Sequence, residues 1–464
     1  MLRLGDGQVE CLWDEVLPEE ARALPEDLQA LDELLRDPAV LRPIKSHWRQ
    51  QDAAAGRSAA SRGRPTISMQ TYVRLMVVKH RTGWGYETLM REVSDSLHLR
   101  RFCLIALGER VPDESTVRKL TRKLGAAVVN ELTRVVIDRA RREKRFRPRA
   151  ARIDSTVVEA DVRYPTDSGL ALDSARVLAR EARKLLVKVG RDAGHVRDRS
   201  RAIGRRVRAM TRTLGRRTGE RKQQVLELTE QAAKQMQRSI REAKRLVVVA
   251  RRRARGRGAK AKLRQIDRFE AFVERSERVA EQIRKRMCGE RITDRLVSIF
   301  DPDARPIRKG KLGKPNEFGF VAQICELTEN TKTGARGLII PATSEIGNPQ
   351  EDTLLPDTVA ELERLGISPR EVALDGGFNV GPTRQALERF EPERTLIAGR
   401  QQPGSRRTQR RLARYRTGTE GRISHLKRGY GLRRTRLKDH QGMQTWTGWS
   451  ILTYNLDTLA VRTS

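Results

Sequence analysis

The sequence predicts an α/β domain with a mixed sheet, interrupted by a long basic helical segment and preceded by an all-α module. Three observations indicate this class. Strand-like segments rich in β-branched residues occur near residue 150 and again after residue 290. Helical periodicity dominates between them, and amphipathic helical patterns precede them. Because the early strand needs the later ones as partners in a sheet, we interpret the residues between them as an insertion.

Composition limits the function classes. The chain has 464 residues, with 95 Lys and Arg against 59 Asp and Glu, which gives a formal charge of +36. A polyanion is the natural partner of such a chain, and nucleic acid is the first choice; an anionic membrane surface or a ribosomal-type structural role are the alternatives. Hydrophobic residues make up 38% of the chain, enough for packed cores. The scattered cysteines favour neither a disulfide scaffold nor a zinc finger, since none stand at zinc-ligand spacing: Cys11, Cys103, Cys288 and Cys325.

Nothing in the chain reads as a membrane segment or a signal peptide. The first residues are acidic and mixed, without a basic stretch that leads into an apolar one. The longest apolar runs, such as residues 246–250, are far shorter than the ~18 residues a membrane helix needs. We therefore expect a cytoplasmic, nucleoid-associated protein of bacterial type with no membrane partner.

The N-terminal part divides into two predicted regions. Residues 1–61 read as a helical segment followed by a linker, since 51–65 is rich in small and polar residues and ends in proline. Residues 62–145 read as a helical module, with an amphipathic helix from Ile67 and a short basic helix that follows Asp113 and ends at Gly125. A helix-turn-helix that reads DNA is one interpretation of the basic helix, and a solvated face of an ordinary helix is the other. Under the first interpretation the DNA-binding residues are Arg118, Lys119, Arg122 and Lys123.

Residues 174–290 read as a basic helical insertion. They contain 36 basic and 13 acidic residues, an excess of 23 positive charges. Apolar residues recur every three to four positions between residues 225 and 243, which predicts a helical hairpin or bundle with turns near 190–194 and 255–258. We expect this insertion to grip DNA backbone, with binding that weakens steeply as salt rises.

The α/β domain is assigned to residues 146–173 and 291–464. A strand is predicted at 151–164, where β-branched residues precede Pro165. Further strands are predicted at 297–300, 319–326, 337–341, 372–374 and 395–398, and helices at 353–365 and 381–389. This alternation is typical of an α/β domain with a mixed sheet.

Three carboxylates stand out by their context. Asp154 interrupts an apolar strand, although strands disfavour aspartate. Asp375 follows a short apolar strand and precedes two glycines, at the strand end where open α/β sheets place their sites. Glu420 shares one helical face with Arg416 and Lys427. A helix cap, a turn residue or a surface ion pair is the alternative reading of each carboxylate.

Metal-assisted phosphodiester chemistry needs such a trio. Two Mg²⁺ ions about 3.5–4 Å apart require hard oxygen ligands, so that one activates the attacking group and the other stabilises the leaving oxygen. Asp154, Asp375 and Glu420 are the candidate ligands for such a pair of Mg²⁺ ions, for which Mn²⁺ can substitute.

The order of these motifs resembles the insertion-sequence DDE transposases, whose catalytic domain is RNase H-like, and within them the ISNCY group. A strand with aspartate precedes Asp-Gly-Gly-Phe and then Arg-xxx-Glu-xxxxxx-Lys. The resemblance covers residues 62–170 and 295–460. Its further motifs are Asp154-Ser-Thr-Val-Val-Glu159, Tyr164-Pro-Thr-Asp-Ser-Gly169, Gly63-Arg-Pro65, Gly83-Trp-Gly-Tyr86, Pro112-Asp-Glu-Ser-Thr116 and Lys314-Pro-Asn-Glu-Phe-Gly319.

Asp154, Asp375 and Glu420 fall at the family's catalytic carboxylates, so the resemblance implies that they are the catalytic residues and metal ligands. It also implies polynucleotidyl transfer at one site on double-stranded DNA, at transposon ends and target alike. A metal-activated water cuts the element's end, and the exposed 3′-OH attacks target DNA. Arg416, Arg422 and Lys427 would contact phosphate, although Lys427 also reads as a plain surface lysine. A homodimer or higher homo-oligomer is expected, because two ends must be joined. The tyrosine position of the family's signature helix is Ala413 here, with Tyr415 out of step, and two glycines that flank Glu420 weaken the helix.

Other functions stay open at this point. An RNase H-like structure-specific nuclease is the nearest enzymatic alternative. A catalytically inactive, basic DNA-binding protein derived from a transposase is another, although all three carboxylates are present. A basic architectural or RNA-packaging protein explains the charge but not the carboxylates. Trp446 and Trp449 are compatible with stacking on a flipped base, but their helical spacing favours a place in the core.

Overall fold

The computed structural model describes residues 2–3, 16–54, 56, 67–213, 219–308, 316–401 and 404–463. The motif Gly63-Arg-Pro65 and most of the predicted linker lie outside these residues, as do Lys314 and Pro315. The chain forms two compact units. We call residues 1–161 with 319–464 the sheet unit, and residues 162–318 the bundle unit.

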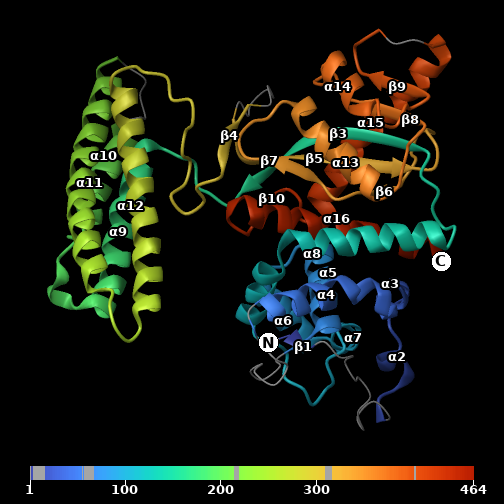
Figure 1. Cartoon of the computed structure of the whole chain (residues 1–464), viewed down its shortest axis with the longest axis horizontal. Coiled ribbons are helices and arrows are strands. Elements are labelled where there is room, and N and C mark those ends of the chain that lie inside the picture. Colours follow the sequence, from blue (N-terminus) through green and yellow to red (C-terminus); the bar gives the residue numbers. More distant parts are fainter. Residues whose placement is uncertain are drawn as a thin grey trace. The chain divides into compact units, whose positions relative to one another are not determined.

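A mixed sheet organises the sheet unit (Figure 1). Its strand order is β5-β3-β8-β9, formed by β3 (Ala150–Ala160), β5 (Glu317–Thr328), β8 (Glu371–Leu374) and β9 (Arg394–Ile397). β3 runs antiparallel to β5 and parallel to β8, and β8 runs parallel to β9. The short strands β10 (Arg434–Thr435), β6 (Leu338–Ile339) and β7 (Thr343–Glu345) pair with β3 or β5. The predicted α/β class with a mixed sheet is confirmed.

The two faces of the sheet have different partners. On one face Ile153 and Leu374 join a large apolar core with α13 (Leu355–Arg364), α14 (Val380–Leu387) and α16 (Asp439–Thr463). The short helix η3 (Glu351–Leu354) directly precedes α13. On the other face Ala150 and Ala373 pack against Leu412 and other residues of α15 (Arg406–Gly429). Because side chains alternate along a strand, Asp154 shares the α15 face with Ala150.

The N-terminal helices share the large apolar core of the sheet unit. They are α3 (Glu26–Arg36), α4 (Pro38–Ala54), α5 (Met69–Thr82), α6 (Tyr86–Asp95), α7 (Leu97–Phe102) and α8 (Glu114–Arg142). The short helix α2 (Glu19–Arg22) precedes them, and the short strands β1 (Leu2–Arg3) and β2 (Ile67–Ser68) pair with each other. α8 packs along α16. Residues 51–54 belong to α4, so the linker prediction was wrong there. The buried side chains of Trp48 and Asp52, four residues apart, continue the inner face of that helix.

The basic helix predicted to end at Gly125 does end there. Asp113 caps it, since the Asp113 side chain accepts a hydrogen bond from the Ser115 backbone N–H at 2.7 Å. Gly125 has φ 68° and ψ −176°, which breaks α8 into two helical segments. Only glycine adopts this region of backbone space without substantial strain.

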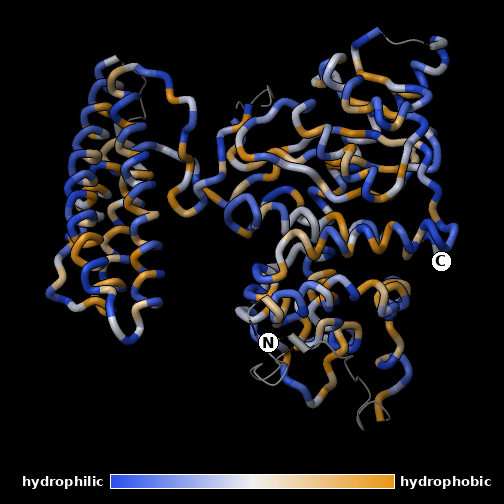
Figure 2. The backbone as a smooth tube through the Cα atoms, viewed as in Figure 1, coloured by the Kyte–Doolittle hydropathy of each residue, from blue (hydrophilic) through white to orange (hydrophobic). Residues whose placement is uncertain are grey.

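Four helices form the bundle unit and lie side by side (Figure 1). They are α9 (Asp167–Val189), α10 (Ser200–Thr213), α11 (Gly219–Arg253) and α12 (Ala259–Met287), with the short elements η2 (Arg191–Ala193) and β4 (Arg305–Ile307). Hydrophobic residues alternate with hydrophilic ones along each helix (Figure 2), and the hydrophobic ones meet in a separate core. The chain turns at Gly190 and Gly194 and again at Gly256 and Gly258, all with positive φ.

The strand predicted at 297–300 is not formed. Leu296 and Ile299 instead insert into the core of the bundle unit from an extended segment after α12. A short apolar run does not by itself distinguish a buried strand from another buried segment, and here residues 296–299 are all buried without pairing as a strand.

Among the described residues, the structure contains no helix of the length and apolar character that crossing a membrane would require.

Replacing Gly125 by alanine should lower the free energy of unfolding by about 1–3 kcal/mol, because alanine is strained at this φ and ψ. No atom lies within 4 Å of the added Cβ, so backbone strain alone accounts for the loss. Urea denaturation of the full chain measures it. Gly381→Ala is the matched control: it is also open, sits in α14 without a positive φ, and should leave stability unchanged or slightly higher. Equal stabilities of the two variants would contradict the strain.

Candidate active site

Two aspartates meet at neighbouring strands of the sheet unit. β3 pairs in parallel with β8 so that Ile153 lies opposite Leu374. The next residues, Asp154 and Asp375, therefore continue side by side, and both project from the sheet face that α15 covers. The Asp154 side chain is buried and accepts a hydrogen bond from the Ser155 backbone N–H at 2.7 Å, whereas that of Asp375 is 39% exposed. The structure thus brings together two of the three predicted carboxylates.

Glu351 is a third carboxylate at this point, and it was not anticipated. One oxygen each of Asp154, Glu351 and Asp375 lies within 4.8 Å of the others. We call these three residues the carboxylate cluster. Among the described residues it is the set of acidic, histidine and cysteine side chains placed to share a metal ion.

Two contacts place Glu351. Its backbone carbonyl accepts a hydrogen bond from Gln323 Nε2 at 2.7 Å, and Gln323 lies on β5. Gly377, two residues after Asp375, makes room for the side chain: a Cβ there would lie 2.5 Å from Glu351 Oε2. The two glycines after Asp375 are therefore explained in part by the approach of this carboxylate.

Glu420 is linked to the carboxylate cluster through an arginine. Arg416 Nη1 donates to Asp375 Oδ1 at 2.6 Å, and Arg416 Nη2 donates to Glu420 Oε1 at 3.1 Å. Arg416 and Glu420 are four residues apart and share one face of α15, as their spacing predicted. The Glu420 side chain is 66% exposed, so it lies beside the cluster, with Arg416 between the two acids.

A buried ionic network holds α15 on the sheet. Glu326 of β5 is fully buried and pairs with Arg152 of β3 at 2.7 Å and with Arg422 of α15 at 3.0 Å. Arg152 also donates to the Tyr415 carbonyl at 2.9 Å. We call Arg152, Glu326 and Arg422 the buried triad. These contacts fix the orientation of α15 about its own axis, so that Arg416 faces the sheet.

The buried triad corrects the role predicted for Arg422. This residue was expected to contact DNA, but its side chain is almost completely buried against Glu326 and over the ring of Tyr454. Its positive charge compensates the buried Glu326 carboxylate. The prediction was wrong because the acidic partner lies 96 residues away in the chain.

A second ion-pair group fastens the first half of α15. Glu371, at the start of β8, accepts hydrogen bonds from Arg411 at 2.8 Å and from Arg394 at 2.9 Å. Partial burial of Glu371 opposes its ionisation, but these hydrogen bonds outweigh that effect and lower the pKa of its carboxyl group. The helix is thus tied to the sheet on both sides of the candidate site.

Tyr415 and the tryptophans are structural. The Tyr415 hydroxyl lies 2.6 Å from Thr328 Oγ1, and burial raises the pKa of Tyr415. Trp446 and Trp449 are 5% and 1% exposed, and Trp446 Nε1 donates to the Gly431 carbonyl at 2.8 Å. They belong to the interior, as their helical spacing predicted, which leaves neither ring exposed for stacking on a flipped base.

The remaining predicted DNA-binding residues lie in two places. Lys427 is half-buried in the last turn of α15. On α8, Lys119 and Arg122 are exposed, Arg118 pairs with Glu114, and Lys123 lies 3.6 Å from the centre of the Trp48 ring. Lys119 and Arg122 thus lie on the surface without a described ion pair or hydrogen bond, while Arg118 and Lys123 contact side chains of their own unit.

Comparison with known proteins points to transposases. Residues 27–123 match the model of a family described as a transposase domain (DUF772), which covers the helices from α3 to the basic helix of α8. A Rhizobium meliloti protein named "Uncharacterized protein ORF8 in nfe locus" is 26% identical over 142 residues, which make up 30% of this chain and 69% of that protein. No solved structure matches the chain. The family match supports a transposase-type protein, a class of DNA-processing and DNA-binding enzymes.

Two glycines of α15 test how closely this helix packs against the sheet. Gly418 lies against the buried triad, since a Cβ there would be 2.0 Å from Arg152 Nη1, whereas Gly421 faces open space. We expect Gly418→Ala to lower the free energy of unfolding by about 1–3 kcal/mol through overpacking. Gly421→Ala should be neutral or raise it by up to about 1 kcal/mol, because alanine favours helix. Thermal and urea unfolding measure both; a Gly418→Ala protein as stable as Gly421→Ala would refute the close contact.

Proposed function

We propose that the protein is a DNA transposase of the DDE class, with an RNase H-like catalytic domain, that cleaves the ends of an insertion sequence and transfers them to target DNA. The observation that carries the proposal is the meeting of Asp154 and Asp375 at adjacent strands, with Glu420 joined to Asp375 through Arg416. The transposase-domain match in the same chain supplies the DNA substrate.

The donors fit a divalent metal. The three carboxylate oxygens of the carboxylate cluster are hard, anionic ligands, which suit Mg²⁺ and Mn²⁺. When bound, two such ions lower the pKa of the attacking hydroxyl and stabilise the leaving oxygen of the phosphodiester. Asp154 and Asp375 would hold the metal, with Glu420 and Glu351 as the further candidate ligands.

The residues of the chain position the DNA and balance its charge. The guanidinium of Arg416 lies between two acids and offers a positive group where a scissile phosphate would approach them. Lys427, about three turns further along α15 than Arg416, supplies a second cation for the DNA backbone. Phosphoryl transfer asks little more of a protein than such positioning and charge neutralisation.

The N-terminal helices supply a second contact with DNA in this proposal. The basic helix of α8 exposes Lys119 and Arg122 to solvent, three residues apart on one face. Both can reach phosphates when the helix lies along a groove. Because two DNA ends have to be joined, the active species in this proposal is a homodimer or higher oligomer.

Asp154→Asn, Asp375→Asn and Glu420→Gln should each reduce Mg²⁺-dependent DNA cleavage by about 10³-fold or more, since each removes a charge from the reacting centre. DNA binding, measured in EDTA by fluorescence anisotropy, should stay near that of the unchanged protein. The readout is cleavage of labelled DNA ends together with strand transfer to a plasmid. Asp357→Asn removes an exposed acid from α13 and serves as the control. Full activity of any of the three variants removes that residue from the site, and cleavage without strand transfer points to a nuclease.

Glu351→Gln addresses the unanticipated member of the carboxylate cluster. If Glu351 is a metal ligand, the Mg²⁺ concentration for half-maximal cleavage should rise by about 10- to 100-fold, while DNA binding in EDTA stays unchanged. Titration of Mg²⁺ in the cleavage assay measures this. An unchanged Mg²⁺ requirement would mean that Glu351 only lines the site.

A further inference from the structure

The outer surface of the bundle unit carries two regular rows of arginines. On α10, Arg201, Arg205, Arg208 and Arg212 follow one another at steps of four, three and four, and all are exposed. On α11, Arg238, Arg241, Arg245 and Arg252 follow the same rhythm, with the exposed Val248 completing the row. Steps of three and four keep side chains on one helical face. We call these the α10 row and the α11 row.

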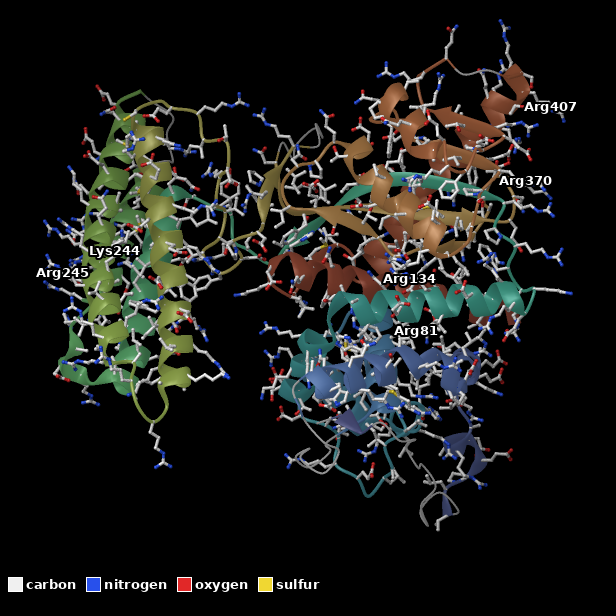
Figure 3. All side chains as sticks on the ribbon, in the orientation of Figure 1. Arg81, Arg134, Lys244, Arg245, Arg370 and Arg407 are labelled. Atoms are coloured by element: carbon white, nitrogen blue, oxygen red, sulfur yellow. The ribbon has the colours of Figure 1, made fainter. Side chains whose placement is uncertain are left out.

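The two rows stand on neighbouring helices. Arg206 of α10 donates to Gln231 of α11 at 3.2 Å, and the hydroxyl of Thr229 on α11 lies 3.8 Å from the sulfur of Met210 on α10. The apolar residues of both helices point the other way, into the core of the bundle unit. The rows are therefore parts of the outer, solvent-facing surface of this helix pair, and Figure 3 labels Arg245 there.

The arginines in the rows lack acidic partners, unlike several other cations of the bundle unit. None of the eight forms an ion pair or side-chain hydrogen bond with a described residue. Beside the α11 row, by contrast, Arg251 pairs with Glu270 and Lys244 pairs with Glu277, both on α12. On α12, Arg278 pairs with Asp294 at 2.8 Å and Arg284 with Glu281 at 2.7 Å. Eight positive charges are thus left for an external partner.

The spacing of the rows suits a nucleic-acid backbone. From Arg238 to Arg252 the helix rises about 21 Å, at about 1.5 Å per residue. Duplex DNA presents about one negative charge per 1.7 Å of its axis, so it offers several phosphates to each arginine over that length. Guanidinium groups bind phosphate oxygens in pairs of hydrogen bonds, which favours arginine over lysine at such contacts.

Two other partners fit the rows poorly. A membrane-bound basic helix inserts an apolar face into the lipid, but here the apolar faces are buried in the bundle core and Val248 is the one apolar member of the rows. A second copy of the chain would need an acidic surface. The acids Glu270 and Glu277 of α12, which are candidates for that surface, are already engaged with α11.

We propose that the α10 and α11 rows form a DNA-binding surface of their own, which holds the backbone of duplex DNA without reading its sequence. Only the identity of the polyanion rests on the proposed function, through the transposase-domain match. The surface lies in the bundle unit, whereas the carboxylate cluster lies in the sheet unit.

Charge-removing variants of the full chain test the surface. One variant replaces the four arginines of the α11 row by glutamine, a second replaces those of the α10 row, and a third, the matched control, carries Lys244→Gln, Arg251→Gln, Arg278→Gln and Arg284→Gln. All three lose four charges. Binding to a mixed-sequence DNA duplex is followed by fluorescence anisotropy in EDTA, from about 50 to 200 mM salt, where affinity for DNA responds steeply to salt.

Each phosphate contact contributes about 0.9 to the slope of log affinity against log salt. We expect each row variant to flatten the slope by about 3 to 4, and the control variant by less than about 1. Circular dichroism confirms that each variant is folded. Equal slopes for row and control variants would overturn the proposal, because net charge alone would then explain binding. Tighter binding of the unchanged protein to duplex RNA or to anionic lipid vesicles than to DNA would overturn it too.

These readouts are independent of catalysis. Because EDTA prevents metal-dependent cleavage, a protein that binds DNA through the rows but never cuts it would contradict the proposed function and leave this surface standing. If the unchanged protein cuts and transfers DNA but both row variants keep its salt slope, the proposed function stands and the DNA-binding surface on the rows is contradicted.

Discussion

The arrangement of the candidate site depends on one buried carboxylate. Glu326 has no exposed surface, and the cost of burying it is offset by ion pairs with Arg152 and Arg422 and by a hydrogen bond from the Gly337 backbone N–H at 2.9 Å. Removing one partner from such a pair typically costs about 3–5 kcal/mol, because the other charge is left buried without compensation. The three charged groups come from β3, β5 and α15, so all three elements must pack together before each buried charge has its partner.

This constraint explains why the functional side chains stand where they do. Along β3, Arg152 and Asp154 project to the α15 face, whereas Ile153 projects into the apolar core. The buried triad holds α15 over the first of these residues, and Arg416 then reaches Asp375 beside the second. Gly418 lets the helix come close enough, since any larger residue would meet the Arg152 guanidinium. The glycine that seemed to weaken the helix is thus a condition for its packing.

Local patterns in the sequence predicted much of this arrangement, and long-range contacts supplied the rest. The strands at 372–374 and 395–398 were visible as short apolar runs between polar ones, and Asp375 was singled out because two glycines follow a strand end. Glu351 escaped notice, since an acid in the first turn of a helix is common and stabilises the helix dipole. Its approach to Asp375 depends on Gln323 in β5, 28 residues earlier in the chain. The spacing of residues along a strand or helix does not predict a contact between two separate elements.

Arg422 shows that the number of positive charges in a chain does not reveal which of them can bind DNA. Arg422 and Arg134 look like any other cation of a chain with a formal charge of +36, yet each is buried against a glutamate, Glu326 for the first and Glu361 for the second. Such arginines stabilise the fold and are unavailable to a polyanion. Outside the candidate site, a cation is available to the DNA backbone when no acid of its own chain has engaged it. By that criterion the excess of 23 charges in residues 174–290 is not spread evenly over the bundle unit. On α12 several cations have acidic partners, such as Arg278 with Asp294 and Arg284 with Glu281. On α10 there are five arginines and no acid, and four of these arginines stand in the α10 row without an acidic partner among the described residues.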